Sequence, residues 1–189
     1  MRSGLRTERL LLRPITLDTA RRILGGRQVD VETWAPGYPP DDEIGLHRLL
    51  VDAHTEPAGW GPWQLLRTAG DDLVAVGGIG FLGSPDAHGE VEVGFGLVRS
   101  ARGAGLAAEA LVAMVGWATG HGAQVVYGTT TRDNLASQRT MLRAGLRPRT
   151  PHPATSSPPS RHARTRAGAG SGGSEMLRFV TGVGRPGRE

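Results

Sequence analysis

A glycine-rich loop between an expected strand and an expected helix is the part of this sequence best suited to chemistry. The loop is Arg102-Gly-Ala-Gly105. The first amides of a helix have no intrahelical partner, and the helix dipole adds partial positive charge there. Gly103 and Gly105 carry no side chain that would keep a phosphate from those amides, and Arg99 lies nearby. The loop predicts either a site for a phosphate-bearing ligand or a glycine turn with solvated arginines.

The strand before this loop alternates between apolar residues and glutamate or glycine. Val91, Val93, Phe95 and Leu97 form one face, whereas Glu90, Glu92, Gly94 and Gly96 form the other. The helix after the loop is expected to end near Gly120. Its apolar residues recur at helical spacing: Leu106, Ala110, Ala113, Met114 and Trp117. These two elements therefore hold the loop between them.

Composition limits the kind of protein this is. A chain of 189 residues suffices for one domain with a real core, and no apolar run approaches the length of a membrane span. The absence of cysteine excludes disulfides and a cysteine nucleophile, and the absence of lysine excludes a phosphate-loop lysine. We expect no metal site, because His47 and His54 lack a third ligand and are expected at the surface. The N-terminus shows no secretory signal, so a cytoplasmic location is expected.

The order of elements predicts an α/β fold of the mixed α+β kind. Helices are expected at residues 15–24, 41–54, 106–120 and 134–144, and strands at 7–13, 61–67, 73–81, 91–98, 124–130 and 175–180. Three consecutive strands favour antiparallel pairing, and the strand, helix and strand that follow form a parallel crossover. We therefore expect a mostly antiparallel sheet of six to seven strands flanked by about four helices.

Single residues mark several boundaries of these elements. Thr16 is an expected helix N-cap, as are Asp41 or Asp42 and Asn134 or Asp133. The glycines of the third strand, at 77, 78 and 80, predict a bulge or a close approach of another backbone.

The end of the chain differs from the rest in composition. No acidic residue lies between Asn134 and Ser174, and residues 151–173 contain almost nothing large and apolar. Such a segment buries too little to offset the entropy of ordering. We expect a domain at 1–149, a disordered or long-loop insertion at 150–174, and a last strand with a frayed tail at 175–189.

Taken together, four motifs resemble the GCN5-related N-acetyltransferases (GNAT). They are Thr7-Glu-Arg-Leu-Leu-Leu-Arg-Pro14, Val91-Glu-Val-Gly-Phe95, Arg102-Gly-Ala-Gly-Leu-Ala-Ala-Glu-Ala-Leu111, and Asn134-Leu-Ala-Ser137 with Ala144-Gly-Leu146. Their order and spacing are most similar to the branch that acetylates N-terminal amines of ribosomal proteins. The resemblance covers about residues 7–148 and implies a GNAT-like sheet and an acetyl-CoA-dependent N-acetyltransferase domain at 1–149.

The resemblance also implies where acetyl-CoA binds. Its pyrophosphate would lie on the glycine loop, and its pantetheine arm would pair with the strand before the loop. The family signature is Gln/Arg-x-x-Gly-x-Gly/Ala. Its first position, a glutamine or arginine in relatives, falls on Ser100 here, and the arginine lies one residue earlier, at Arg99. The implied cofactor-binding residues are Phe95, Gly96, Leu97, Val98, Arg99, Arg102, Gly103, Ala104, Gly105, Leu106, Ala107, Asn134 and Ser137.

Acetyl transfer to an amine requires a base, a donor for the oxyanion and a proton for the leaving thiolate. Glu92 is the candidate base, acting through water, although a solvated strand carboxylate is the alternative. A backbone amide near Phe95 would serve the oxyanion. Relatives often use a tyrosine as the general acid at the position of Met141, so this acid is missing here. Asn134 and Ser137 are the other candidate catalytic residues. The alternative role of Asn134 is to cap the helix that follows it.

The acceptor amine is left open by the sequence. Trp34 and Tyr38 lie in the loop where relatives build the acceptor pocket, although they would serve equally as a hydrophobic plug. Glu90 is a further candidate for acceptor binding and a second candidate base. A protein N-terminus, a small-molecule amine and an amino acid are all compatible with the motifs. The expected partners are acetyl-CoA and this amine, with no membrane, in a monomer or homodimer.

Two other functions were weighed against this one. Gly103-Ala-Gly105-Leu-Ala-Ala108 also matches a dinucleotide-binding fingerprint of an oxidoreductase, but its strand alternates and the next strand does not end in the required acid. The formal charge of +4 suits nucleic acid, as does a basic C-terminal part with no acid among its arginines, which are Arg139, Arg143, Arg147, Arg149, Arg161, Arg164 and Arg166. No aromatic residues interleave with those arginines, so nucleic-acid binding is the less favoured reading.

Overall fold

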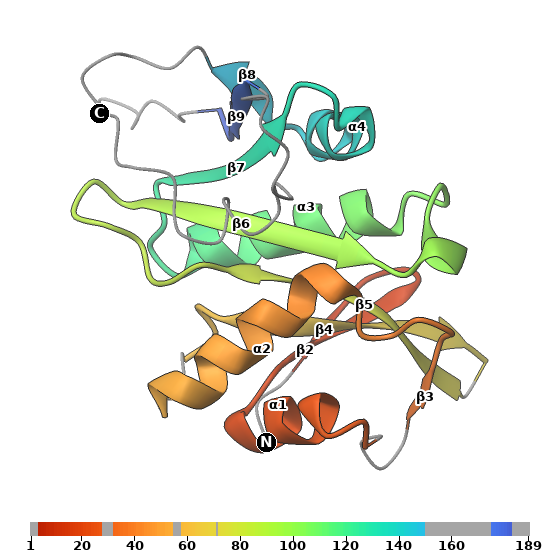
Figure 1. The fold of residues 1–189 in the computed structure, drawn as a ribbon. Coiled ribbons are helices and arrows are strands. Elements are labelled where there is room, and N and C mark those ends of the chain that lie inside the picture. The colour runs from red at the N-terminus through yellow and green to blue at the C-terminus, as the bar shows by residue number, and fades with distance from the viewer. Residues whose placement is uncertain (1–3, 28–31, 55–57, 71, 150–174, 183–189) are drawn as a thin grey trace.

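The computed structural model describes residues 4–27, 32–54, 58–70, 72–149 and 175–182 (Figure 1). The expected insertion at 150–174 lies outside them. The helices are α1 (Leu17–Leu24), α2 (Asp41–Ala53), α3 (Leu106–Gly120) and α4 (Leu135–Arg143), with the short 3-10 helix η1 (Arg99–Ala101). The strands are β1 (Leu5–Arg6), β2 (Leu10–Pro14), β3 (Glu32–Trp34), β4 (Pro62–Ala69), β5 (Asp72–Phe81), β6 (Glu90–Leu97), β7 (Val125–Thr131), β8 (Arg147–Arg149) and β9 (Met176–Val180).

The described strands form one mixed, mostly antiparallel sheet, as predicted. Its order is β1-β2-β4-β5-β6-β7-β9-β8, and β3 pairs with β5 outside this path. Only β3–β5 and β6–β7 are parallel pairs among the described strands. The sheet has nine strands instead of six or seven, because β1, β3 and β8 are pieces of two or three residues that carry no readable periodicity. Figure 1 shows α2 on one face of the sheet and α3 on the other.

The ends of the helices test the expected caps. Thr16 caps α1 by accepting a hydrogen bond from the Thr19 amide, and Asn134 caps α4 in the same way, as predicted. The prediction for α2 was wrong: the helix already begins at Asp41, and its N-cap is Pro40, without a side-chain hydrogen bond. Proline suits this place because its φ is fixed near the helical value.

The expectation of a close backbone approach at the β5 glycines is confirmed. The register between β4 and β5 shifts at Leu65/Leu66, so the ladder is irregular there. A Cβ at Gly77 would lie 2.2 Å from the Gly96 carbonyl oxygen, and one at Gly80 would lie 2.5 Å from the Gly61 carbonyl oxygen. Only glycine allows the neighbouring strands to pack this closely.

The first turn of α3 is tied to the chain before β2 by Glu109. Its carboxylate accepts hydrogen bonds from the Thr7 hydroxyl (2.5 Å), the Arg9 amide (2.9 Å) and Arg9 Nε (2.7 Å). Arg9 Nη1 in turn donates to the carbonyl oxygen of Ala104 in the glycine loop (2.9 Å). Glu109 and Arg9 therefore fix the loop that the sequence marks as a binding element.

We expect Glu109→Gln to lower the free energy of unfolding by about 1–3 kcal/mol at neutral pH, because it removes a hydrogen-bonded charge. Burial opposes ionisation, but the bonds from Thr7 and Arg9 outweigh it and hold the pKa of Glu109 below its ordinary value. A lowered pKa stabilises the fold above the ordinary value near pH ~4.3, and this contribution is lost as pH falls through the folded value. The difference in unfolding free energy between the variant and wild type, measured with urea, should therefore be constant above about pH 5 and become smaller below about pH 4. A difference that does not change with pH, or one equally large for the exposed Glu8→Gln, would contradict this role.

Candidate active site

A cleft opens where β6 and β7 separate. The two strands pair only at Glu90–Glu92 with Val125–Tyr127, and beyond these residues they diverge, as Figure 1 shows. The cleft has a volume of about 820 Å³, which is within the range of ligand sites. Its walls are β6, the glycine loop, the first turn of α3, the end of β7, one face of α4 and part of α2.

The glycine loop and the start of α3 form one end of this cleft. Arg102, Gly103, Gly105, Leu106 and Ala107 line it, together with Ala108. Gly103 and Gly105 have φ of +83° and +81°, a left-handed conformation that favours glycine. Gly105 is the N-cap of α3 and makes no side-chain cap, so the first-turn amides lie open at a bare helix N-terminus. The loop therefore has the geometry expected of an anion cradle.

The backbone of β6 presents alternate residues to the cleft. Val98 donates its amide to the Val76 carbonyl oxygen of β5 (2.9 Å), and residues of the same parity face β5 along the ladder. The backbone groups of Phe95 and Leu97 consequently point to the side where β7 departs. The Leu97 carbonyl oxygen accepts a bond from Arg102 Nε (2.9 Å). Phe95 and Leu97 are thus better placed than Gly96 and Val98 for backbone pairing with a ligand.

Of the other implied cofactor residues, Asn134 and Ser137 line the opposite wall of the cleft, on the first turn of α4. Asn134 Oδ1 accepts from the Ser137 amide (3.1 Å), which confirms the capping role. Arg99 in η1 and Ala104 in the loop are exposed and are not among the residues that line the cleft. Met141 is buried against Gly128, and its thioether carries no proton to donate, so it supplies no acid.

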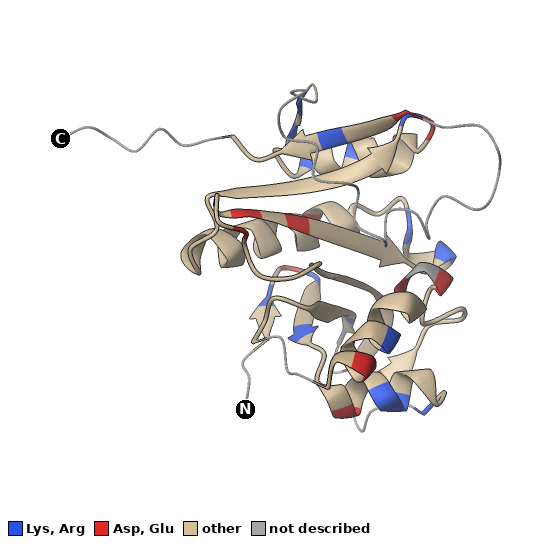
Figure 2. Ribbon diagram, turned by 60° about the vertical axis from the view of Figure 1, so that its left-hand side comes forward, with Lys and Arg blue, Asp and Glu red and all other residues tan. Residues whose placement is uncertain are grey.

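Glu92 and Glu90 have different surroundings although they lie on the same face of β6. Glu92 lines the cleft, and its Oε1 accepts a hydrogen bond from the Thr129 hydroxyl (2.5 Å). The Glu90 carboxylate pairs with Arg178 of β9 (2.5 Å) and lies 3.7 Å from Arg149 of β8. Figure 2 shows acidic positions along β6 and basic positions on β8 and β9, with β7 between β6 and this pair of strands. Glu90 therefore links β6 to β8 and β9 across β7, whereas Glu92 faces the cleft.

Trp34 and Tyr38, the predicted acceptor residues, pack against each other with ring centroids 5.2 Å apart. Tyr38 is buried and Trp34 partly buried, and neither belongs to the lining of the cleft. Burial and the charge of Glu43 raise the pKa of Tyr38, so its hydroxyl stays protonated.

Several residues of the cleft wall were not selected by sequence reasoning. Thr129, Thr130 and Thr131 end β7 there, and Arg139, Thr140 and Arg143 extend the wall along α4. Arg139 and Arg143 are spaced four apart and therefore share a helix face. This spacing could have indicated a shared basic face on the helix, but the sequence analysis assigned both arginines to the basic C-terminal part that suits nucleic acid. With Arg102, they give the cleft three arginines against the two acids Asp41 and Glu92.

The prediction that His47 lies at the surface was wrong, because its side chain faces the sheet from α2 and is buried. Among the described residues no cluster of histidine and acidic side chains suits a metal ion. Within the same part of the chain, every helix is too short or too polar to span a membrane.

Comparison with known proteins identifies the family. The model of the acetyltransferase (GNAT) domain family matches residues 9–147, and the chain therefore belongs to the GNAT acetyltransferases. It is 37% identical over 108 residues to YjdG of Bacillus subtilis (strain 168), named an uncharacterized N-acetyltransferase. That match spans 56% of this chain and 62% of YjdG, less than two thirds of the relative's length.

Solved structures show the same fold at low sequence identity. A putative GNAT-family acetyltransferase from Bordetella pertussis aligns with a TM-score of 0.59 and 22% identity over 95% of this chain and 99% of its own. RimL, an alpha-N-protein acetyltransferase of ribosomal L7/L12, aligns with a TM-score of 0.60 and 12% identity over 94% and 95%. These likenesses support the predicted sheet and helices.

Proposed function

We propose that this protein transfers the acetyl group of acetyl-CoA to a primary amine. The observation that carries the proposal is the cleft between the diverging β6 and β7, which ends on the bare N-terminus of α3. A pyrophosphate suits the loop, because Gly103 and Gly105 have positive φ, line the cleft and leave the backbone amides of the loop and helix start without a covering side chain. Arg102, Arg139 and Arg143 supply the positive charge that a phosphate-rich ligand needs.

The residues along the cleft have separate roles in this proposal. Backbone groups of Phe95 and Leu97 hold the pantetheine arm, and the Phe95 amide faces the carbonyl oxygen of the thioester. Acetyl-CoA supplies a thioester: the amine nitrogen bonds to its carbonyl carbon, the carbon–sulfur bond breaks, and a proton leaves the nitrogen. Glu92 receives that proton through water, and Ser137 offers a hydroxyl to the leaving sulfur.

The N-terminal amine of a protein is the acceptor we favour, and a small-molecule amine is the second candidate. RimL, which shares the fold, is an acetyltransferase of a protein α-amine. The dinucleotide alternative is not favoured, because β6 is antiparallel to β5 and belongs to a GNAT domain. Of the arginines that suggested nucleic acid, Arg139 and Arg143 instead line the cleft.

The proposal is tested by measuring thiol release from acetyl-CoA in the presence of amines. The chain has no cysteine, so a thiol reagent detects only the CoA that is formed. We expect Glu92→Gln to lower kcat by about 10²-fold or more, with the Kd for acetyl-CoA changed less than about twofold. The exposed Glu8→Gln serves as the matched control outside the cleft. Full activity of Glu92→Gln across the pH range would remove Glu92 as the base.

A further inference from the structure

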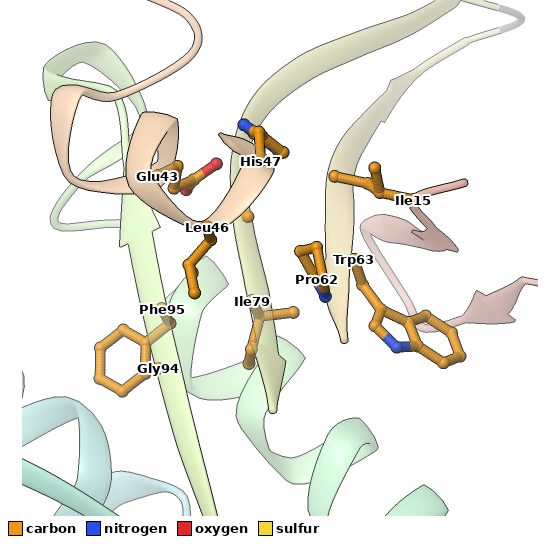
Figure 3. Close-up of a pocket in the computed structure, with 10 residues that line it drawn as sticks. Ile15, Glu43, Leu46, His47, Pro62, Trp63, Ile79, Gly94 and Phe95 are labelled. Atoms are coloured by element: carbon orange, nitrogen blue, oxygen red, sulfur yellow. The ribbon is translucent and has the colours of Figure 1, made fainter. Parts of the chain in front are cut away.

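A second, much smaller cavity lies between α2 and strands β4, β5 and β6 and adjoins the cleft (Figure 3). Its volume is about 10 Å³, which is room for about one water-sized group. Leu46, Gly94 and Phe95 line both the cavity and the cleft. The cavity therefore lies beside the segment of β6 to which the proposed function assigns the thioester.

Two polar side chains of α2 line this cavity. Glu43 and His47 are one helical turn apart and project toward β5 and β6 in Figure 3. They are only 4% and 1% exposed. His47 Nδ1 has no hydrogen-bond partner among the described residues, although buried polar atoms are normally paired. A ligand that donates a hydrogen bond would satisfy this nitrogen.

Two glycines keep the space beneath α2 open. The Glu43 carboxylate lies directly over Gly78 of β5, where a Cβ would be 2.5 Å from Glu43 Oε2. A Cβ at Gly94 of β6 would meet nothing within 4 Å, so the strand leaves room there. The remaining walls are mostly apolar, with Ile15, Leu46 and Ile79 among them. The cavity thus has apolar walls and a polar end formed by Glu43 and His47.

The charges at the polar end favour a cation. Burial lowers the pKa of His47 to about 4, so its imidazole is uncharged at neutral pH and does not repel a positive group. The charge of Glu43 acts on the nearby Tyr38, whose hydroxyl stays neutral. An ammonium group would therefore meet a carboxylate and a neutral hydrogen-bond acceptor.

We propose that Glu43 and His47 bind the amino group of the acceptor, with the carboxylate facing its charge and Nδ1 accepting one N–H. This inference rests on the proposed function, because it places the nitrogen beside Gly94 and Phe95 at the edge of the cleft. The size of the cavity limits the acceptor to unhindered primary amines. An N-methylated amine carries an additional carbon on its nitrogen and does not fit.

The direct test is a nuclear magnetic resonance titration of the histidine rings in the full chain with methylammonium chloride. We expect saturable shifts of the His47 signals, assigned by loss of those signals in His47→Gln, and no such shifts with tetramethylammonium chloride. Glu43→Gln should abolish the response, whereas Asp52→Asn, an exposed carboxylate on the same helix, should keep it. Equal shifts with both cations, or none up to about 100 mM methylammonium, would overturn the inference.

A kinetic experiment separates this inference from the proposed function. With a short peptide that has a free N-terminal alanine, Glu43→Gln should raise the KM for the peptide at least about tenfold and leave the Kd for acetyl-CoA within about twofold. The N-methylalanine peptide should react at least about 100-fold more slowly with wild type. Acetylation with an unchanged KM and no discrimination would overturn the amine site alone. Failure of acetyl-CoA to bind would overturn the proposed function and the inference with it.

Discussion

Replacing Gly105 with aspartate should abolish detectable binding of acetyl-CoA. The variant places a side chain and a negative charge at the N-cap of α3, where the pyrophosphate is proposed to lie. Loss of one charge-assisted bond weakens binding by about 1.5–3 kcal/mol, and charge repulsion adds to this, so Kd should rise at least about 100-fold. Calorimetric titration of the folded variant measures the effect.

A matched variant separates this effect from backbone strain. Gly122, which follows the end of α3, has φ of +95°, and a Cβ there would meet nothing within 4 Å. Gly122→Asp therefore introduces the same residue at a comparable left-handed position outside the cleft. It should bind acetyl-CoA like wild type. Equal loss of binding in both variants, or unchanged affinity of Gly105→Asp, would refute the assignment of the glycine loop.

Reversing the two arginines of α4 should have the second largest effect. Arg139→Glu combined with Arg143→Glu turns two positive charges of the cleft wall into negative ones. We expect a rise in the Kd for acetyl-CoA of about 10- to 100-fold in low salt, and a smaller difference from wild type in about 0.5 M salt because ions screen exposed charges. Calorimetry at several ionic strengths gives both values.

The control for this double variant keeps the same change in net charge. Arg21 on α1 and Arg67 on β4 are exposed and lie outside the cleft lining. Arg21→Glu combined with Arg67→Glu should change the affinity less than about threefold. If both double variants weaken binding equally, the effect comes from the overall charge of the protein, and α4 makes no specific contact.

Much of the fold was predictable because its long elements carry strong local signals. The alternation of β6, the glycine loop and the stripe of α3 are contiguous in the sequence, so one reading located the strand, the loop and the helix together. The N-cap at Asn134 was equally local. By contrast, β3 is three residues long and forms only through parallel pairing with Leu73–Ala75, a distant contact that no local pattern encodes.

The α2 side of the candidate site could not be predicted for a different reason. The buried positions Glu43, His47 and Leu50 follow helical spacing, but two of the three are polar. Hydrophobic periodicity therefore did not mark this face as buried, and His47 was expected at the surface. Only the packing of α2 over Gly78 brings these groups to the cavity. Polar residues on a core face are a typical sign of a binding site, which sequence periodicity alone misses.

The most direct test of the central claim is calorimetric titration of the full chain with acetyl-CoA, with NAD and a short DNA duplex as controls. The claim is that the cleft between β6 and β7 binds acetyl-CoA through the glycine loop. It predicts saturable binding of acetyl-CoA with a Kd in the micromolar range, about −8 kcal/mol, and no binding of either control. A folded sample that does not bind acetyl-CoA, or that binds NAD or DNA instead, would contradict it.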